Sequence, residues 1–414
     1  MKSLDEWLRY IERQHPKSIA LGLDRVSQIF SRMGVKIDCP VLTVGGTNGK
    51  GSTCAMLESI LRAAGYRTGL YTSPHLLRYN ERVRAAGAEV SDGALIAAFA
   101  AVEEARGDVP LTYFEFGTLA ALWLFSAERI EVAVLEVGLG GRLDAVNIVD
   151  PDCAVLTSVG IDHVDYLGSS REEIGREKAG IFRAGRPAVI AEPDPPQTVL
   201  QSPGKHLRIG RDFGFIPEER QWSYWGPGGK RGGLAYPALR GGIQLRNAAA
   251  AICALGALEL PVAMQEVRRG LAEVEIAGRF QVLPGRPQVI LDVAHNPQAA
   301  KVLAQNLADS GFAPETIAVC GMLRDKDIAA VLRELAPRVT RWHFASLPGP
   351  RGALAAEVAK QSQIERASLF DSPAAAFVAA KAVANESDKI VVFGSFLTVA
   401  EVMAWLNNNK TSTR

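Results

Sequence analysis

The alternation of short apolar runs with longer segments of helical periodicity constrains the fold of this sequence most strongly. In the N-terminal part the runs are rich in Val, Ile and Leu without polar alternation, which is typical of parallel strands buried on both faces. The expected strands lie at residues 41–44, 68–71, 132–137, 154–157 and 188–191. The expected helices lie near 50–64, 92–104, 116–127 and 171–182. This order predicts a doubly wound α/β domain.

A second domain is expected because 414 residues are many for a single hydrophobic core. Segment 201–242 breaks the alternation and predicts short antiparallel strands and loops attached to the first domain, before helical periodicity resumes at 246–258. Alternation restarts after Pro284-Gly285-Arg286-Pro287, a composition that suits a linker. Further strands are expected at 288–293, 316–320, 341–345 and 390–393. We therefore expect domains at 1–284 and 285–414, the second smaller and Rossmann-like.

The composition is that of an ordinary globular protein, with 48% hydrophobic and 22% charged residues. A net charge of +1 argues against nucleic acid or an anionic membrane as the main partner. The five cysteines are scattered without metal-ligand spacing, which indicates free thiols in a reducing compartment. The sequence shows neither an apolar signal segment nor an apolar stretch of bilayer length. We expect a cytoplasmic protein and a monomer.

The glycine-rich stretch 45–52, Gly-Gly-Thr-Asn-Gly-Lys-Gly-Ser, follows the first expected strand. Its spacing differs from the usual P-loop, which would have glycine at Val44 and Ser or Thr at Gly51. Glycines at a strand-to-helix turn let backbone N–H groups converge on an anion, and the helix adds its positive N-terminus. Lys50 would add a charge for a phosphate, and Ser52 a hydroxyl for Mg²⁺. An ordinary tight turn with a solvated lysine is the alternative.

Polar residues also follow other expected strands, at the sheet edge where α/β proteins bind ligands. Ser73, Glu136 and His163 supply a hydroxyl, a carboxylate and an imidazole that are candidate Mg²⁺ ligands. Each is equally compatible with a purely hydrogen-bonded role. Lys178, near a helix C-terminus, is best interpreted from the residue alone as a surface lysine favoured by the helix dipole.

The second domain offers Asp292 and His295 at a strand end, in Leu-Asp-Val-Ala-His-Asn-Pro. An acid in that position can accept hydrogen bonds from ribose hydroxyls. Arg279, just before the expected linker, could contact a phosphate. A structural salt bridge is the alternative for these residues.

Together, and in this order, the stretches resemble the folylpolyglutamate synthase and dihydrofolate synthase family, within the Mur ligase superfamily. The resemblance spans the chain almost end to end. The matching stretches are GGTNGKGS (45–52), YTSPHL (71–76), NERVR (80–84), TYFEFGT (112–118), LEVGLGGRLDAVNIV (135–149), SVGIDHVDYLG (158–168), REKAGI (176–181), GRFQ (278–281), LDVAHNPQAA (291–300), GMLRDKD (321–327) and GSFLTV (394–399).

The glycine loop of this family has the same altered spacing, so the resemblance implies that loop 45–52 binds ATP. The implied ATP-binding residues are Gly49, Lys50, Gly51, Ser52, Asn247, Arg279 and Asp292. The implied ligands of two Mg²⁺ ions are Ser73, Glu136, His163 and Lys178. For Lys178 the family match reverses the interpretation above, because it implies a carbamylated lysine whose carboxylate-like group binds magnesium. The implied catalytic residues are Lys50, Lys178 and His295.

The same resemblance implies three contacts with a pterin-bearing substrate. They are Ala20, Leu21 and Gly22; Thr112, Tyr113, Phe114 and Glu115; and Leu143, Asp144 and Ala145. The first differs from bifunctional relatives, which commonly have Asp-Leu-Gly where this chain has Ala20-Leu21-Gly22. Loss of that carboxylate weakens the case for dihydropteroate, whereas the stretch 112–115 resembles the bifunctional bacterial type.

The implied reaction joins L-glutamate to dihydropteroate and to tetrahydrofolate or its glutamylated forms, through an acyl phosphate made with ATP. The first domain is expected to bind ATP and the pterin or folate, and the second to bind glutamate, with loop 346–352 helping. A monofunctional folylpolyglutamate synthase and another Mur-type amino-acid ligase are the alternatives within the superfamily. A phosphotransferase or ATPase and a non-catalytic nucleotide-binding module are the alternatives from other classes.

Overall fold

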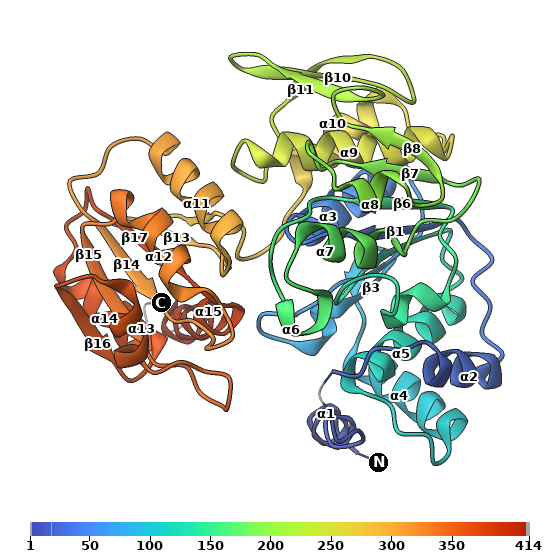
Figure 1. Ribbon diagram of the computed structural model, residues 1–414, viewed down its shortest axis with the longest axis horizontal. Coiled ribbons are helices and arrows are strands. Elements are labelled where there is room, and N and C mark those ends of the chain that lie inside the picture. Colours follow the sequence, from blue (N-terminus) through green and yellow to red (C-terminus); the bar gives the residue numbers. More distant parts are fainter. Residues whose placement is uncertain (1, 18, 411–414) are drawn as a thin grey trace. The chain divides into compact units, whose positions relative to one another are not determined.

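The computed structural model describes residues 2–17 and 19–410, which form two compact units (Figure 1). Unit 1 contains the residues up to Ala238 together with Gln244–Val274, and unit 2 contains Leu239–Ile243 and the residues from Glu275 onward. Each unit is built on a largely parallel sheet with helices around it, so the prediction of a two-domain α/β fold is confirmed. Among the described residues, no helix combines the length and the apolar character needed to cross a bilayer.

Unit 1 has an eight-stranded sheet in the order β4-β3-β2-β5-β1-β6-β7-β8. The strands from β2 to β8 in this order run parallel, and β3 and β4 add an antiparallel edge. The bounds are β1 Val41–Gly45, β2 Thr68–Tyr71, β3 Val83–Ala85, β4 Ala88–Glu89, β5 Val132–Glu136, β6 Cys153–Leu156, β7 Pro187–Ile190 and β8 Lys205–Arg208. The five strands expected in this part correspond to β1, β2, β5, β6 and β7, within one residue at each end.

Several helices of this part begin at residues whose side chains cap them. Thr112 caps the helix Tyr113–Ala127 through a capping box with Glu115, which satisfies backbone N–H groups that lack a helical partner. The bounds are α1 Leu4–Ile11, α2 Asp24–Met33, α3 Lys50–Ala63, α4 Asp92–Arg106, α5 Tyr113–Ala127, α6 Val164–Leu167, α7 Arg171–Ala179, α8 Gln197–Leu200, α9 Ile243–Ala257, α10 Met264–Glu273, and the 3-10 turns η1 Tyr79–Arg82 and η2 Ala145–Ile148.

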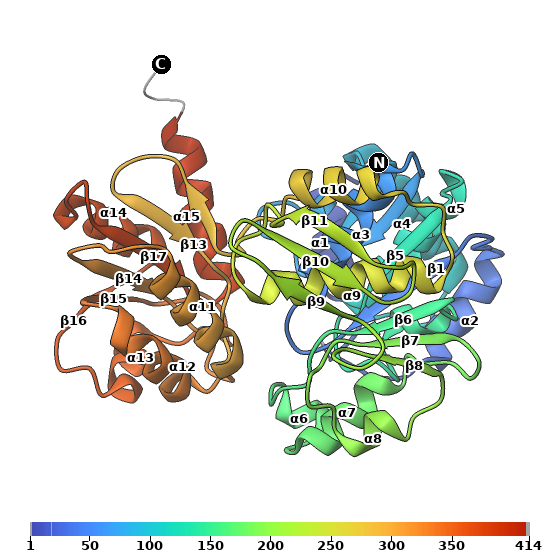
Figure 2. The same ribbon diagram turned by 90° about the horizontal axis from the view of Figure 1, so that it is seen from above.

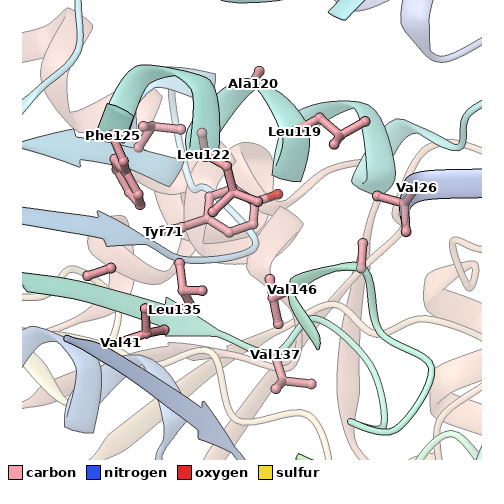
Figure 3. Close-up of a cluster of buried hydrophobic side chains, with 14 of the residues drawn as sticks. Val26, Val41, Tyr71, Leu119, Ala120, Leu122, Phe125, Leu135, Val137 and Val146 are labelled. Atoms are coloured by element: carbon pink, nitrogen blue, oxygen red, sulfur yellow. The ribbon is translucent and has the colours of Figure 1, made fainter. Parts of the chain in front are cut away.

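Successive side chains of a strand point to opposite faces of a sheet. Both faces of this sheet are buried. On one face, Tyr71 of β2 and Leu135 of β5 pack with Leu122 of α5 in a continuous hydrophobic cluster (Figure 3). On the other face, Leu42 of β1 is fully buried and α3 packs against β1, β2 and β5. The helix that follows the glycine loop is therefore anchored to the centre of the sheet.

The segment after β8 forms a separate three-stranded antiparallel sheet in the order β11-β10-β9, near α10 (Figure 2). Its strands are β9 Gly214–Pro217, β10 Gln221–Trp225 and β11 Arg231–Ala235. The prediction of short antiparallel strands here is confirmed for these three. β8 differs, because it pairs in parallel with β7 and extends the main sheet.

Unit 2 has a six-stranded sheet in the order β12-β13-β17-β14-β15-β16, parallel except for β12. Its strands are β12 Gln281–Leu283, β13 Gln288–Leu291, β14 Thr316–Cys320, β15 Arg341–Ala345, β16 Ala367–Phe370 and β17 Lys389–Phe393. Its helices are α11 Pro297–Asp309, α12 Ile328–Leu335, α13 Ala355–Ser362, α14 Pro373–Val383, α15 Phe396–Lys410 and the 3-10 turn η3 Ala336–Arg338.

The stretch Pro284-Gly285-Arg286-Pro287 does not separate the two units. It is the turn between β12 and β13, which pair antiparallel through Leu283 and Val289. Its turn-forming composition suits a hairpin as well as a linker, because both need residues that interrupt regular structure. The sheet of unit 2 therefore already includes residues 281–283.

A close approach between α10 and α3 yields a test of the packing behind the glycine loop. A Cβ added at Gly270 would lie 2.5 Å from Ile60 Cα and 2.6 Å from Ile60 N, both backbone atoms of α3. We expect Gly270→Ala to lower the free energy of unfolding by about 1–3 kcal/mol, because the two helix backbones must move apart. Urea unfolding measures the change. Gly93→Ala, in open space in the first turn of α4, is the control and should not lower stability; equal stability of the two variants would contradict the prediction.

Candidate active site

The glycine loop between β1 and α3 is held by the end of β6. Thr47 N–H donates to the Ser158 carbonyl at 2.9 Å, and Asn48 N–H donates to Ser158 Oγ at 2.9 Å. Gly46 has φ of +147°, and a Cβ there would overlap the Thr157 side chain. Glycine is therefore required at Gly46 on both steric and conformational grounds.

Lys50, the first residue of α3, turns back over this loop. Its ammonium donates to the Gly46 carbonyl at 3.0 Å and to the Thr47 carbonyl at 3.3 Å. Gly49 has φ of +89°, and a Cβ there would lie 2.8 Å from Asn247 Oδ1. The structure thus brings together the predicted loop and the predicted Asn247, and the first turn of α3 contains no acidic residue that would oppose an anion.

Two of the predicted magnesium ligands meet at neighbouring strand ends. The Ser73 N–H, just after β2, donates to the carboxylate of Glu136 at 3.1 Å, and Glu136 is the last residue of β5. Glu136 is 4% exposed. This contact places the Ser73 backbone and the Glu136 carboxylate together at the carboxyl edge of the sheet.

His163 lies on the loop before α6 in a left-handed conformation, with φ of +54°. The His163 side-chain Nε2 is 4.0 Å from Asp162 Oδ1, and the His163 backbone N–H donates to the same oxygen at 2.8 Å. A non-glycine residue in this conformation is uncommon and is found more often at functional sites. Asp162 therefore lies beside the His163 side chain, although the sequence analysis did not select it.

Lys178 is buried at 5% exposure, so the interpretation of it as a surface lysine from the residue alone is wrong. Burial, with repulsion from Lys50, lowers the pKa of its ammonium to about 7, against the attraction of Asp162 and Asp144. A lysine with that pKa is substantially a neutral amine near neutral pH, which makes it a nucleophile. Its position at the last turn of α7 was visible in the sequence, but its burial was not.

The residues at this edge fit a divalent cation that is completed by other ligands. Among the described residues, no three His, Cys, Asp or Glu side chains form a ready-made metal cluster. Mg²⁺ usually takes one or two carboxylates, with phosphate oxygens and water filling its octahedron. Glu136, Ser73 and His163 supply hard or borderline donors of that kind. Their roles as metal ligands stay a prediction.

A cavity of about 130 Å³ opens beside this edge of the sheet in unit 1. Every predicted substrate-binding residue except Tyr113 lines it, and its lining is Ile19, Ala20, Leu21, Gly22, Thr112, Phe114, Glu115, Gly138, Leu139, Leu143, Asp144 and Ala145. Three stretches far apart in the sequence thus form one hollow.

The guanidinium of Arg25 links two walls of this cavity through hydrogen bonds. Arg25 donates from Nη2 to the Ala20 carbonyl and to Glu115 Oε1, each at 2.9 Å. The other Glu115 oxygen accepts the Thr112 N–H at 2.7 Å. Glu115 is therefore engaged by the protein through both oxygens, and it shapes the wall. The sequence analysis missed Arg25, whose partner lies 90 positions away.

Asp144 forms the opposite wall. Its carboxylate accepts the Leu139 N–H at 2.8 Å and the Val146 N–H at 3.1 Å. Burial nevertheless raises the pKa of Asp144 to about 7, against the lowering by these hydrogen bonds and by Lys50. The carboxyl group is therefore poised to change charge near neutral pH.

The predicted residues of unit 2 also lie together. Asp292 accepts the Phe280 and Ala294 N–H groups, each at 2.8 Å, and burial raises its pKa although Arg279 and these bonds oppose the change. Arg279 lies over the Phe396 ring at 5.0 Å, and the His295 ring centroid is 6.3 Å from the same ring. The ATP and catalytic roles of Arg279, Asp292 and His295 stay predictions.

The loop expected to recognise glutamate contains a cation that is already paired. Arg351 donates to Asp325 through Nε at 3.1 Å and Nη2 at 2.8 Å, a bidentate contact. This pair ties loop 346–352 to the loop after β14.

Two family models match the chain: the Mur ligase middle domain over residues 44–221, and the Mur ligase glutamate ligase domain over residues 278–396. The dihydrofolate synthase/folylpolyglutamate synthase of Escherichia coli (strain K12) is 49% identical over 405 residues, covering 97% of this chain and 94% of that protein. The chain belongs to the dihydrofolate synthase/folylpolyglutamate synthase family.

Solved structures of this family share the whole fold. Escherichia coli FolC in complex with DHPP and ADP has a TM-score of 0.94 at 46% identity, with 99% of each chain covered. The bifunctional folylpolyglutamate synthase/dihydrofolate synthase of Yersinia pestis, complexed with AMPPNP and Mn ion, has a TM-score of 0.92 at 46% identity, with 98% of each chain covered. The predicted family and fold are thereby confirmed, and the chain is a Mur-type ligase.

The raised pKa of Asp144 predicts a pH-dependent cost to stability. A carboxyl whose pKa is about 7 when folded and about 3.8 when unfolded destabilises the fold increasingly as pH rises from 4 to 7, because the folded state binds the proton more tightly. Asp144→Asn should therefore gain about 2–3 kcal/mol relative to wild type between pH 5 and pH 8. Urea unfolding at both pH values measures this difference.

The control for Asp144→Asn is Asp108→Asn, on an exposed turn. It should shift the free energy of unfolding equally at the two pH values. A pH-independent effect of Asp144→Asn would show that the carboxyl is ionised at low pH in the folded protein.

Proposed function

We propose that this protein joins L-glutamate to dihydropteroate, forming dihydrofolate, and to tetrahydrofolate or its glutamylated forms, forming folylpolyglutamates, with ATP as the energy source. The observation that carries the proposal is the convergence of three distant stretches on one cavity beside the glycine loop and the Ser73–Glu136 contact. Sequence identity of 49% to an enzyme named for both activities supports it.

The chemistry requires two anions, a carboxylate and a triphosphate, to approach each other. One carboxylate oxygen attacks the γ-phosphorus of ATP, ADP leaves, and an acyl phosphate forms. The amine of L-glutamate then attacks the acyl carbon, phosphate leaves with the C–O electron pair, and the nitrogen loses a proton. Catalysis of such a transfer consists mainly of positioning and charge stabilisation.

The glycine loop supplies the first part of that stabilisation. Its N–H groups and the start of α3 favour a bound phosphate, and Gly49, Lys50, Gly51 and Ser52 are the residues we assign to ATP. Lys50 now donates to two loop carbonyls, so its ammonium is already held over the loop and can turn to a phosphate oxygen. Asn247, Arg279 and Asp292 complete the proposed ATP contacts.

Two divalent cations, physiologically Mg²⁺, would be held by Ser73, Glu136, His163 and a carbamate on Lys178. Bound there, they would neutralise charge on the triphosphate and on the acid. The neutral Lys178 amine reacts with CO₂ to give the carbamate and a proton, which converts a buried neutral amine into a buried anion. The lowered pKa of Lys178 supports this step, because only the unprotonated amine attacks CO₂.

Unit 2 would bind the incoming glutamate, as the description of its family model, glutamate ligase domain, suggests. His295 is proposed to lie near the reacting groups; its Nδ1 is 2.8 Å from the Val293 carbonyl, which fixes the ring. We propose that the protein acts in the cytoplasm, where ATP and folates are used. We also propose that it acts as a monomer.

A monofunctional folylpolyglutamate synthase is the second candidate, and Ala20 favours it. Ala20 lines the cavity, where its side chain is an apolar methyl group, and its carbonyl accepts a hydrogen bond from Arg25. A contact that a carboxylate would make with the pterin is therefore lost at this position. A phosphotransferase or ATPase explains neither the cavity nor the match over residues 278–396.

The direct test supplies ATP, Mg²⁺ and L-glutamate with either dihydropteroate or tetrahydrofolate, and measures product and ADP by chromatography. We expect product from each acid, and ADP release that requires both the acid and glutamate. Lys50→Ala should lower turnover roughly 100- to 1,000-fold with the fold intact by circular dichroism, because it removes a charge from the phosphate site. ADP release without glutamate would indicate an ATPase, and product from tetrahydrofolate alone would indicate the monofunctional enzyme.

The carbamate predicts chemical rescue. Lys178→Ala should lose activity about 100-fold or more, because the metal site loses an anionic ligand, and added formate or acetate should restore part of it. Initial rates at increasing acid concentration measure the rescue. Lys205→Ala, an exposed lysine of β8, is the control and should be unaffected; full activity of Lys178→Ala would exclude the carbamate.

A further inference from the structure

The segment that matches NERVR contains an arginine whose position is strongly determined. Arg82 is the last residue of η1, and its carbonyl accepts the Thr72 N–H at 2.9 Å. The preceding Glu81 accepts the N–H groups of Leu76, Leu77 and Arg78, each at 2.7 Å. Glu81 therefore stabilises the turn with its carboxylate and is not the partner of Arg82.

The guanidinium of Arg82 is oriented by neutral groups. Its Nε donates to His75 Nδ1 at 2.8 Å. Its Cζ lies 5.2 Å from the Tyr79 ring centroid and 5.4 Å from the Tyr113 ring centroid, which are cation–π distances. Aromatic faces and an imidazole hold an arginine in place without neutralising its charge.

Arg82 has no acidic partner in the described part of the chain. No Asp or Glu oxygen of residues 2–17 and 19–410 lies within ion-pair distance of it, and its terminal nitrogens make no hydrogen bond to these residues. The side chain is half-buried, and neither terminal nitrogen is sealed from solvent. A partly desolvated cation in this state gains free energy when an anion pairs with it.

The surroundings of Arg82 connect the cavity to the strand ends. Tyr113 lies between Thr112 and Phe114, which both line the cavity. His75 is two positions after Ser73, whose N–H contacts Glu136. Arg82 therefore contacts Tyr113, which is next to the cavity lining, and Thr72, which is next to Ser73.

We propose that Arg82 binds the non-reacting carboxylate of the glutamyl tail of a folate substrate, and so distinguishes folates from pteroates. This rests on the proposed function. Dihydrofolate and dihydropteroate share the pterin and benzoyl parts and differ in the glutamyl tail, which carries a second carboxylate. The reacting carboxylate must keep a lone pair free for phosphorus, whereas the other can accept two parallel N–H bonds from a guanidinium.

The test compares binding of dihydrofolate and dihydropteroate to wild type and Arg82→Gln by isothermal titration calorimetry, with a non-hydrolysable ATP analogue and Mg²⁺ present. The variant should raise Kd for dihydrofolate about ten-fold or more, because one charge-assisted contact is lost. Kd for dihydropteroate should change less than about two-fold, because that ligand lacks the tail. Arg82→Lys should recover only part of the difference.

Arg78→Gln is the matched control, since Arg78 is in the segment before η1 and its side chain is 63% exposed. It should leave both Kd values unchanged. Equal weakening of the binding of both ligands by Arg82→Gln would overturn the proposal, because Arg82 would then contact a part that both ligands share. Unchanged Kd values for both ligands would also overturn it.

Failure of the proposed function has a different outcome from failure of this inference. If wild-type protein bound neither pterin compound, the substrate assignment itself would be wrong, and so would the role proposed for Arg82. If wild type bound both and Arg82→Gln did not separate them, only the role of Arg82 would fall.

Discussion

The hydrogen bonds between the glycine loop and the end of β6 are the interaction on which the rest of the site depends. Thr47 and Asn48 are held by Ser158, and the close contact of Gly46 with Thr157 leaves no room for a side chain. This contact sets where α3 begins, and with it the position of Lys50. Burial sets the direction of the pKa shifts of Lys178 and Asp144, and Lys50 lowers both pKa values. The position of the loop therefore influences the charge of these two groups.

The substrate cavity depends on a second arrangement, the engagement of Arg25 with Ala20 and Glu115. An ion pair of this kind, with Glu115 almost fully buried, fixes geometry more than it adds stability. Ala20 contributes its main-chain carbonyl to this arrangement, so the contact does not depend on the side chain at this position.

Much of this fold could be predicted from local sequence. The parallel strands and the helices that begin at Lys50 and Asp92 were found because periodicity and glycine turns are properties of neighbouring residues. The short antiparallel strands at the sheet edges have too few residues to show alternation and were not identified. Helices α1 and α2 were not identified either, although their apolar residues recur at helical spacing. The stretch 284–287 was interpreted as a linker because a hairpin turn uses the same residues.

The candidate site divides in the same way. Residues at strand ends, such as Ser73 and Glu136, were predictable because parallel strands bring their carboxyl ends to one edge. The burial of Lys178 and the pairing of Arg25 with Glu115 depend on residues distant in sequence, so periodicity and spacing could not reveal them. The same holds for the position of Arg82 over the Tyr113 ring. For Lys178 only the family resemblance implied a role in the site, and that role stays a prediction.

The resting contacts of Lys50 have a consequence for nucleotide choice. A phosphate that recruits this ammonium must replace two carbonyl acceptors at 3.0 and 3.3 Å, so the net gain is a difference between two sets of contacts. If the loop holds ATP as proposed, a ligand with one phosphate would offer little to offset that exchange, whereas a longer polyphosphate would add contacts with the loop amides. The proposed site would then discriminate between nucleotides by their number of phosphates.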